Sequence, residues 1–103
     1  GMVAYAQYAG PGSSVNSDLG KILANPVDDE QVKLTGYLIR KVSSDKYIFS
    51  DGKHQIRVEI DKDVFPSQPF DEKTLIEIEG EVEKDFLESM EIDVERIIIL
   101  PAS

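Results

Sequence analysis

The stretch "GYLIRKVSSDKYIFSDGKHQIRVEID", residues 36–61, decides the fold. Apolar and polar residues alternate through three segments, as in β-strands that bury one face. Two short polar turns, "SSD" at 43–45 and "DGK" at 51–53, separate the segments. The stretch therefore predicts a three-stranded antiparallel meander in which Ile56, Val58 and Ile60 of the third strand face one side.

The same alternation continues on both sides of the meander. The first strand begins near Gln31, and its inward positions are expected at Val32, Leu34, Gly36 and Leu38. A fourth strand is expected over 74–84 and a fifth over 90–100, with inward positions at Ile76, Ile78, Gly80, Val82, Met90, Ile92 and Val94. A glycine inside a strand often marks the bend that a small, tightly coiled barrel needs.

A long connection, "DKDVFPSQPFDEK" at 61–73, separates the third strand from the fourth. Asp61 is expected to begin one helical turn, and Phe65 and Phe70 are expected to plug the end of the core. Five strands with this break predict a mainly all-β fold, a five-stranded OB-fold Greek-key barrel, although an SH3-like barrel has the same strand order. The two glycine-containing strands favour the OB-fold.

A short α-helix is expected before the first strand. Ser14 would cap it, Val15, Leu19, Ile22 and Leu23 would form one apolar stripe, and the Asn25–Pro26 pair would end it. Residues 1–13 are predicted to be a flexible tail, and residues 14–103 a single OB-fold domain. Gly1 is interpreted as an expression scar. The triplet "AYA" at 4–6 is of the kind that ends a secretory signal, so two interpretations stay open, a signal-peptide remnant and a plain disordered tail.

Composition limits the possible functions. The net charge is −9, from 11 Lys and Arg against 20 Asp and Glu, and such a protein repels phosphate backbones at long range. The chain has no cysteine, which excludes disulfides, thiol nucleophiles and cysteine-based zinc sites. No apolar run approaches the roughly 20 residues that span a bilayer, so membrane insertion is not expected.

Two segments are the most specific parts of a family resemblance: the core formed by Gly36, Ile39, Arg40, Asp45, Tyr47, Phe49 and Asp51, and "EIEGEVEKD" at 77–85. With them, nearly the whole chain, from about Gln7 to Leu100, resembles the bacterial OB-fold family, called BOF. The resemblance implies a barrel with an added N-terminal helix, export to the periplasm and a role in stress tolerance, and it supplies neither an enzyme activity nor a ligand. The family often carries a tryptophan between strands three and four, where this chain has "VFPSQPF".

Charge is distributed unevenly. Residues 31–57 hold six basic side chains against two acids, a net +4, whereas residues 59–95 hold fourteen acids against three lysines, a net −11. OB-folds bind ligands on strands two and three and on the loops beside them. The first candidate site is therefore basic and would suit an anionic small molecule or a protein; its residues are Tyr37, Arg40, Lys41, Lys46 and Arg57.

The second candidate is an acidic face on strands four and five, which would bind divalent cations weakly or dock a basic protein. Its residues are Glu77, Glu79, Glu81, Glu91 and Asp93. The simpler interpretation is a solvated face, partly neutralised by Lys33 and Lys41. Carboxylates that alternate along a strand splay apart and lack the spacing of a calcium loop, so no dedicated metal site is expected.

Oligonucleotide binding is the least favoured hypothesis, because it needs exposed aromatic side chains and Tyr47 and Phe49 are expected to face the core. No catalytic motif is found, no cofactor is expected, and His54, the single histidine, is interpreted as a polar turn residue. The sequence thus predicts a non-enzymatic periplasmic binding module that recognises a small molecule or a protein in envelope stress.

Overall fold

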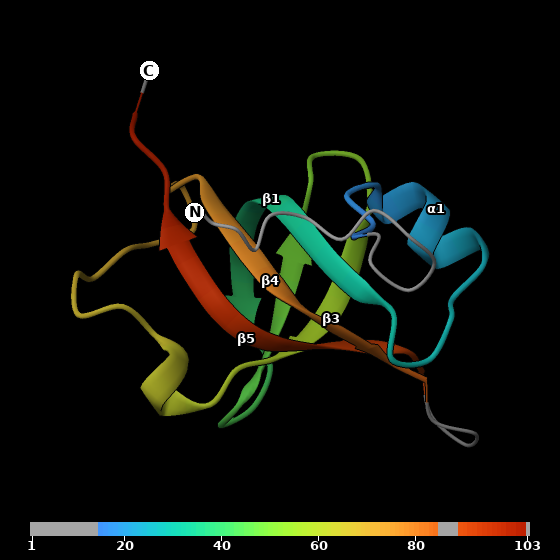
Figure 1. Cartoon of the computed structure of the whole chain (residues 1–103). Coiled ribbons are helices and arrows are strands. Elements are labelled where there is room, and N and C mark those ends of the chain that lie inside the picture. The colour runs from blue at the N-terminus through green and yellow to red at the C-terminus, as the bar shows by residue number, and fades with distance from the viewer. Residues whose placement is uncertain (1–14, 85–88, 103) are drawn as a thin grey trace, which may run out of the picture.

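The chain folds into a closed β-barrel (Figure 1). The computed structural model describes residues 15–84 and 89–102. The predicted tail over 1–13, with its signal-like triplet, lies outside these residues. The described elements are α1 (Leu19–Ala24), β1 (Gln31–Lys41), β2 (Lys46–Ser50), β3 (Gln55–Glu59), the 3-10 helix η1 (Lys62–Val64), β4 (Ile76–Glu83) and β5 (Glu91–Ile99).

The strand order around the barrel is β1-β2-β3-β5-β4, and all neighbours are antiparallel except β3 and β5, which run parallel. This is the predicted OB-fold arrangement, with one short helix before the first strand and a long connection between β3 and β4. None of the helices in the described ranges is long and apolar enough to cross a membrane.

Two glycines allow the strands to bend and approach closely. Gly36 lies where β1 leaves its pairing with β4 and begins its pairing with β2. A Cβ atom at this position would lie 2.1 Å from the carbonyl oxygen of Ser50, and one at Gly80 would lie 2.0 Å from that of Asp93. Both glycines are therefore required by contact with a neighbouring backbone, which explains why each interrupts a strand.

The core is built from the alternating positions that the sequence predicts. Val32, Leu34 and Leu38 of β1 are buried, as are Ile76, Ile78 and Val82 of β4 and Ile92 and Val94 of β5. Met90, also predicted to be inward, is partly buried against this core. The β4–β5 register shifts between Glu79 and Gly80, which leaves Glu95 without an opposing residue and turns Ile97 inward as well.

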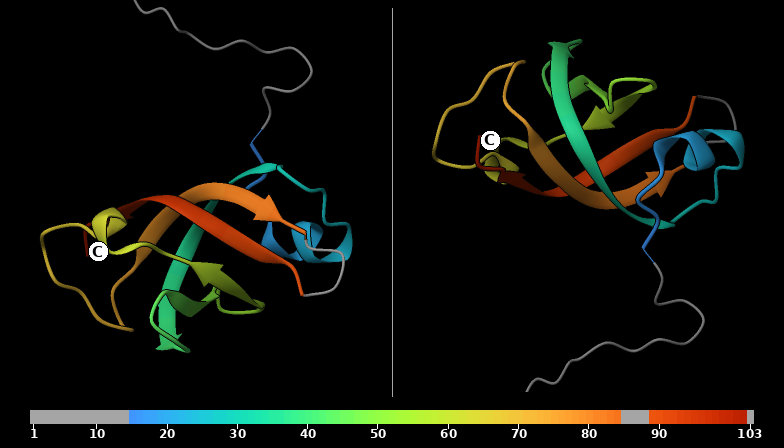
Figure 2. Two further views of the ribbon diagram at one scale, coloured as in Figure 1. Left: turned by 90° about the horizontal axis from the view of Figure 1, so that it is seen from below. Right: turned by 90° about the horizontal axis from the view of Figure 1, so that it is seen from above.

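The two ends of the barrel are closed by different elements, as Figure 2 shows. At one end α1 inserts Leu19 and Ile22, which are 1% and 0% exposed. At the other end Phe65 stacks on Phe70, with ring centroids 6.0 Å apart, and meets the edge of Tyr47 at 5.5 Å. Phe65 and Phe70, the predicted plugs, thus pack against the core at their end of the barrel, as expected.

The predicted start of the helix is wrong. The helix begins at Leu19, and its cap is Asp18, whose side chain accepts a hydrogen bond of 3.1 Å from the amide of Lys21. The chain before it is extended, because Asn16 makes a parallel bridge to β1 at Val32. Val15 is consequently 50% exposed instead of lying in the apolar stripe, and Ser14, the expected cap, lies outside the described residues.

Candidate functional site

The predicted basic site is divided by an acidic residue. Lys46 donates a hydrogen bond of 2.6 Å to Glu91, and Arg57 lies 3.7 Å from the other oxygen of the same carboxylate. Glu91 is the buried charged residue of the described chain, at 8% exposure. Its two basic neighbours therefore compensate a buried carboxylate, which a desolvated charge requires.

The remaining basic candidates lie apart from this pair. Lys41 places its ammonium 5.7 Å from the ring centre of Tyr47, a cation–π contact, and so is not directed at the acidic strands. Arg40 is exposed near the end of β1. Tyr37 lines a hollow beside Leu75 and the C-terminal residues. The structure therefore does not bring the five predicted residues into one hollow.

The acidic face separates into a compensated half and a partly compensated half. In the compensated half, Lys33 lies 3.8 Å from Glu77, and Glu79 is flanked in the ladders by Lys33 on one side and Arg96 on the other. These carboxylates face opposite charges across strands, which is the favourable arrangement. They form a neutralised sheet surface, as the simpler interpretation predicts.

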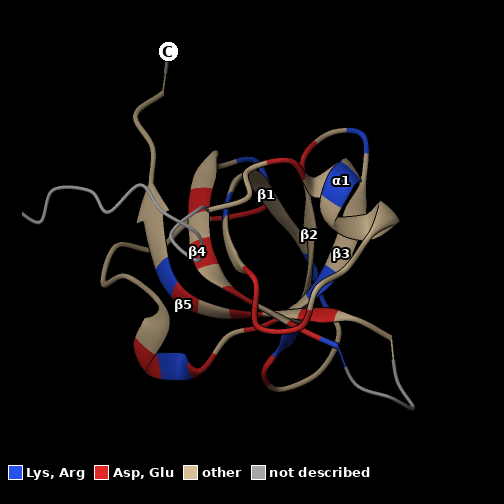
Figure 3. Ribbon diagram, turned by 45° about the vertical axis from the view of Figure 1, so that its right-hand side comes forward, with Lys and Arg blue, Asp and Glu red and all other residues tan. Residues whose placement is uncertain are grey.

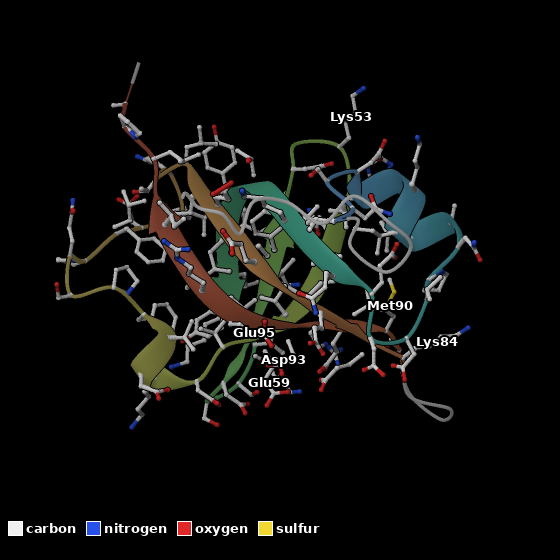
Figure 4. The ribbon with its side chains drawn as sticks, in the orientation of Figure 1. Lys53, Glu59, Lys84, Met90, Asp93 and Glu95 are labelled. Carbon is white, nitrogen blue, oxygen red and sulfur yellow. The ribbon has the colours of Figure 1, made fainter. Side chains whose placement is uncertain are left out.

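The partly compensated half lies where β3, β4 and β5 meet. Glu83 is opposite Glu91 and Glu81 is opposite Asp93 in the antiparallel β4–β5 ladder. The parallel β3–β5 ladder places Glu59 opposite Asp93 as well. Figure 3 shows the acidic segments along β4 and β5, and Figure 4 shows Glu59 and Asp93 together at the lower edge of the barrel.

This group of side chains, called the carboxylate cluster below, consists of Glu59, Glu83 and Glu91. Each offers a carboxylate oxygen, and these oxygens lie within 4.8 Å of one another. A second triad with the same spacing contains Glu59 with Asp45 and Asp61. The cluster borders a hollow of about 400 Å³, the carboxylate hollow, lined by Asp28, Asp29, Lys46, Glu59, Glu83, Lys84, Ser89 and Glu91.

Burial and repulsion raise the pKa of two carboxyl groups here, Glu83 of the cluster and Asp93 beside it. Burial raises the pKa of Asp93 above its ordinary value, and the negative charges of Glu59, Asp61 and Glu81 raise it further. The pKa of Glu83 is raised by the same two causes, first burial and then nearby carboxylates. More negative charge is therefore gathered here than the neighbouring cations compensate.

Lys46 contacts two members of the cluster. Besides its hydrogen bond to Glu91, its ammonium lies 3.4 Å from Glu59. The hydrogen bond to Glu91 is the main reason that the pKa of Lys46 is raised. A divalent cation entering the cluster would replace this ammonium on at least one carboxylate.

Sequence reasoning placed Glu91 and Asp93 correctly on β5 but missed Glu59 as a member of the site. The acidic face was built from β4 and β5 alone, whereas Glu59 comes from β3. A signal was present, because an OB-fold pairs strands three and five in parallel. That pairing would have placed Glu59 beside Asp93.

Two other predicted features can be followed in the structure. Phe49 is fully buried and Tyr47 is partly buried, so neither presents a free ring for base stacking. In the β2–β3 turn, Asp51 accepts hydrogen bonds from the amides of Lys53 and His54, at 2.8 and 2.7 Å. His54 is thereby a polar turn residue, as predicted.

The barrel, its added helix and the long β3–β4 connection define an OB-fold protein. A family model described as "Bacterial OB fold (BOF) protein" matches residues 5–99, and the chain therefore belongs to this family.

The chain is 35% identical over 95 residues to the "Calcium-regulated OB-fold protein CarO" of Pseudomonas aeruginosa, covering 92% of this chain and 81% of that protein. It is 40% identical over 70 residues to "Protein YgiW" of Escherichia coli K12, covering 68% of this chain and 53%, about half, of that relative.

Two solved structures are also similar. That of the hypothetical protein YgiW from E. coli superimposes with a TM-score of 0.74 at 34% identity, covering 90% of this chain and 97% of that one. A chain of the Stn1–Ten1 complex of S. pombe has a TM-score of 0.62 at 14% identity, covering 81% and 73%, and shares the fold alone.

Proposed function

We propose that this protein is a non-enzymatic periplasmic binding module of the BOF family that holds a divalent cation, Ca²⁺, at the carboxylate cluster. The observation that carries the proposal is the convergence of Glu59, Glu83 and Glu91 within 4.8 Å. Carboxylate oxygens are the ligands that Ca²⁺ prefers, and Ca²⁺ accepts the irregular geometry that three separate strands provide. The relative CarO is named as a calcium-regulated protein, which is consistent with this choice of ion.

The affinity is expected to be low. Ca²⁺ takes six to eight oxygen ligands, so water would complete its shell around three carboxylates. The ammonium of Lys46 already compensates Glu91 and would compete with the ion. We expect a dissociation constant on the order of 10⁻⁴ to 10⁻³ M, the range of weak extracellular calcium modules.

The basic candidate site receives less support from the geometry. Two of its members, Lys46 and Arg57, form ion pairs with Glu91, and a third, Lys41, lies over the ring of Tyr47. An anionic ligand at this site stays a prediction. The residues available to it are Arg40 and Tyr37, which do not share a hollow.

The cation proposal is tested by titrating CaCl₂ into chelator-treated protein in a calorimeter. Glu59→Gln removes the residue common to both triads and is expected to weaken binding at least tenfold. Glu72→Gln removes the same unit charge from an exposed position and is expected to change binding less than twofold. Equal losses in both variants would indicate a diffuse ion atmosphere, and no heat at millimolar Ca²⁺ would contradict the proposal.

The periplasmic location and the role in envelope stress are supported by the resemblance to exported BOF proteins. The location is tested by releasing the periplasm of the native host by osmotic shock and detecting the protein with an antibody. Recovery with the cytosolic marker would contradict export. A stress role predicts that deletion of the gene lowers survival under envelope stress, and survival equal to that of the parent strain would contradict it.

A further inference from the structure

A second hollow, called the apolar groove, lies next to the carboxylate hollow. It has a volume of about 330 Å³, and its lining residues are Leu23, Ile48, Gln55, Ile56, Arg57, Ser89 and Met90. Leu23 and Met90 are partly buried against the core, and Ile48 of β2 is half-buried. The groove therefore presents apolar side chains from α1, from β2 and from the residue that precedes β5.

The groove and the carboxylate hollow share one wall. Ser89 lines both, and Glu91 divides them, because it bonds Lys46 on the carboxylate side and Arg57 on the groove side. A ligand can thus place an apolar group in one hollow and a cation in the other. In Figure 4 Met90 and Lys84 lie on the side of the barrel that carries α1.

The size and charge of the two hollows select the kind of ligand. A volume of about 330 Å³ is near the lower end for small-molecule sites, which are about 300–1,000 Å³, and it suits one or two amino-acid side chains. The neighbouring carboxylates and the net charge of −9 favour a cationic partner. In an extended peptide the side chains of alternate residues share a face and lie roughly 7 Å apart, which suits two hollows with a common wall.

We propose that the apolar groove and the carboxylate hollow together bind an extended basic peptide segment, in which a large apolar residue lies two positions from a Lys or Arg. The apolar side chain occupies the groove over Ile48 and Met90. The basic side chain reaches Glu59 and Glu83. The proposal rests on the proposed cation function only in that both use the same carboxylates, so Ca²⁺ and the peptide compete.

The test uses three labelled peptides and fluorescence anisotropy at low ionic strength and at 0.15 M salt. The first probe is Gly-Leu-Ser-Lys-Ser-Leu-Ser-Lys-Gly, whose leucines and lysines share one face when extended; the second replaces both leucines by serine, and the third replaces both lysines by glutamate. The first peptide is expected to bind at least tenfold more tightly than either of the others. If the serine peptide binds as well, the groove takes no part, and if the glutamate peptide binds as well, charge complementarity takes no part; either result overturns the proposal.

Variants separate this proposal from the cation function. Ile48→Gln alters the groove and is expected to weaken the first peptide at least tenfold while leaving Ca²⁺ binding within twofold. Val42→Gln, at a 49% exposed apolar position that does not line the groove, is the control and should change neither. A wild-type protein that binds the peptide but not Ca²⁺ would contradict the cation function alone. An Ile48→Gln variant that binds the peptide like the wild type would contradict the role of the groove in peptide binding.

Discussion

At the scale of single residues, Asp93, which lies beside the carboxylate cluster, gives a prediction about pH. The pKa of Asp93 is raised in the folded protein by burial and by neighbouring carboxylates. A raised pKa means that protonation stabilises the fold, and this stability is lost as the pH rises through the folded pKa. At neutral pH the ionised Asp93 is therefore destabilising.

Replacing Asp93 by asparagine is expected to raise the melting temperature by a few degrees at neutral pH. The gain should disappear below the ordinary pKa of a carboxyl group, where the wild-type side chain is protonated as well. Glu79→Gln is the matched control, because Glu79 is flanked by Lys33 and Arg96 and its neutralisation should give no gain. Melting curves by circular dichroism measure both, and a gain for Asp93→Asn that is the same at both pH values would contradict the electrostatic cause.

The glycines give a second prediction at this scale. Gly80→Ala would bring a Cβ to within 2.0 Å of the carbonyl oxygen of Asp93, so β4 and β5 must separate there. The expected loss is roughly 3 kcal/mol or more of the free energy of unfolding. Gly52, at φ +99° in an open turn, is the comparison, and Gly52→Asn should cost about 1 kcal/mol or less. Urea denaturation gives both values, and a Gly80→Ala cost no larger than that of Gly52→Asn would show that the close approach is relieved.

At the scale of elements, α1 contributes by burial and little by intrinsic helicity. It has six residues, and an isolated helix of this length is unstable in water. Ile22→Ala should therefore cost about 2–5 kcal/mol, and loss of the Asp18 cap in Asp18→Ala about 1 kcal/mol. Lys21→Ala, at an exposed position of the same helix, is expected to be close to neutral. Because alanine is the strongest helix former, a loss for Ile22→Ala no larger than that for Lys21→Ala in urea denaturation would contradict packing as the source of the helix's stability.

The elements also show what the sequence could predict. Alternation identifies the buried face of each strand because it is a local property, and Phe49, Ile56 and Ile78 lie in the core as expected. The helix start was missed because the extended bridge of Asn16 to Val32 depends on a contact made across the fold. The sequence-based prediction of the acidic site lacks Glu59 for the same reason. Glu59 reaches Asp93 only through pairing of strands that are distant in sequence.

At the scale of the whole molecule, the net charge of −9 is a destabilising term that salt should relieve. The acids concentrate where β3, β4 and β5 meet, and screening acts over a Debye length of about 8 Å at 0.15 M salt. The melting temperature is therefore expected to rise with NaCl at neutral pH. At a pH that protonates the carboxylates, the net charge is instead positive, because the eleven Lys and Arg and the single His then carry the charge of the molecule.

The same comparison separates the field of the molecule from a specific cation site. CaCl₂ and NaCl solutions of equal ionic strength screen the field to a similar extent, so a site at the carboxylate cluster should appear as an additional rise in melting temperature with Ca²⁺. Glu59→Gln should abolish the additional rise, because Glu59 belongs to both carboxylate triads. It should leave most of the NaCl response, because it neutralises only one of the twenty acidic residues. At a pH that protonates the carboxylates, the additional rise should vanish in the wild type too, since protons then occupy the oxygens that bind the ion. An additional rise that persists at that pH would mean that Ca²⁺ binds at other groups. Equal melting curves in the two salts at neutral pH would mean that the acidic strands form a solvated face, which affects stability only through its net charge.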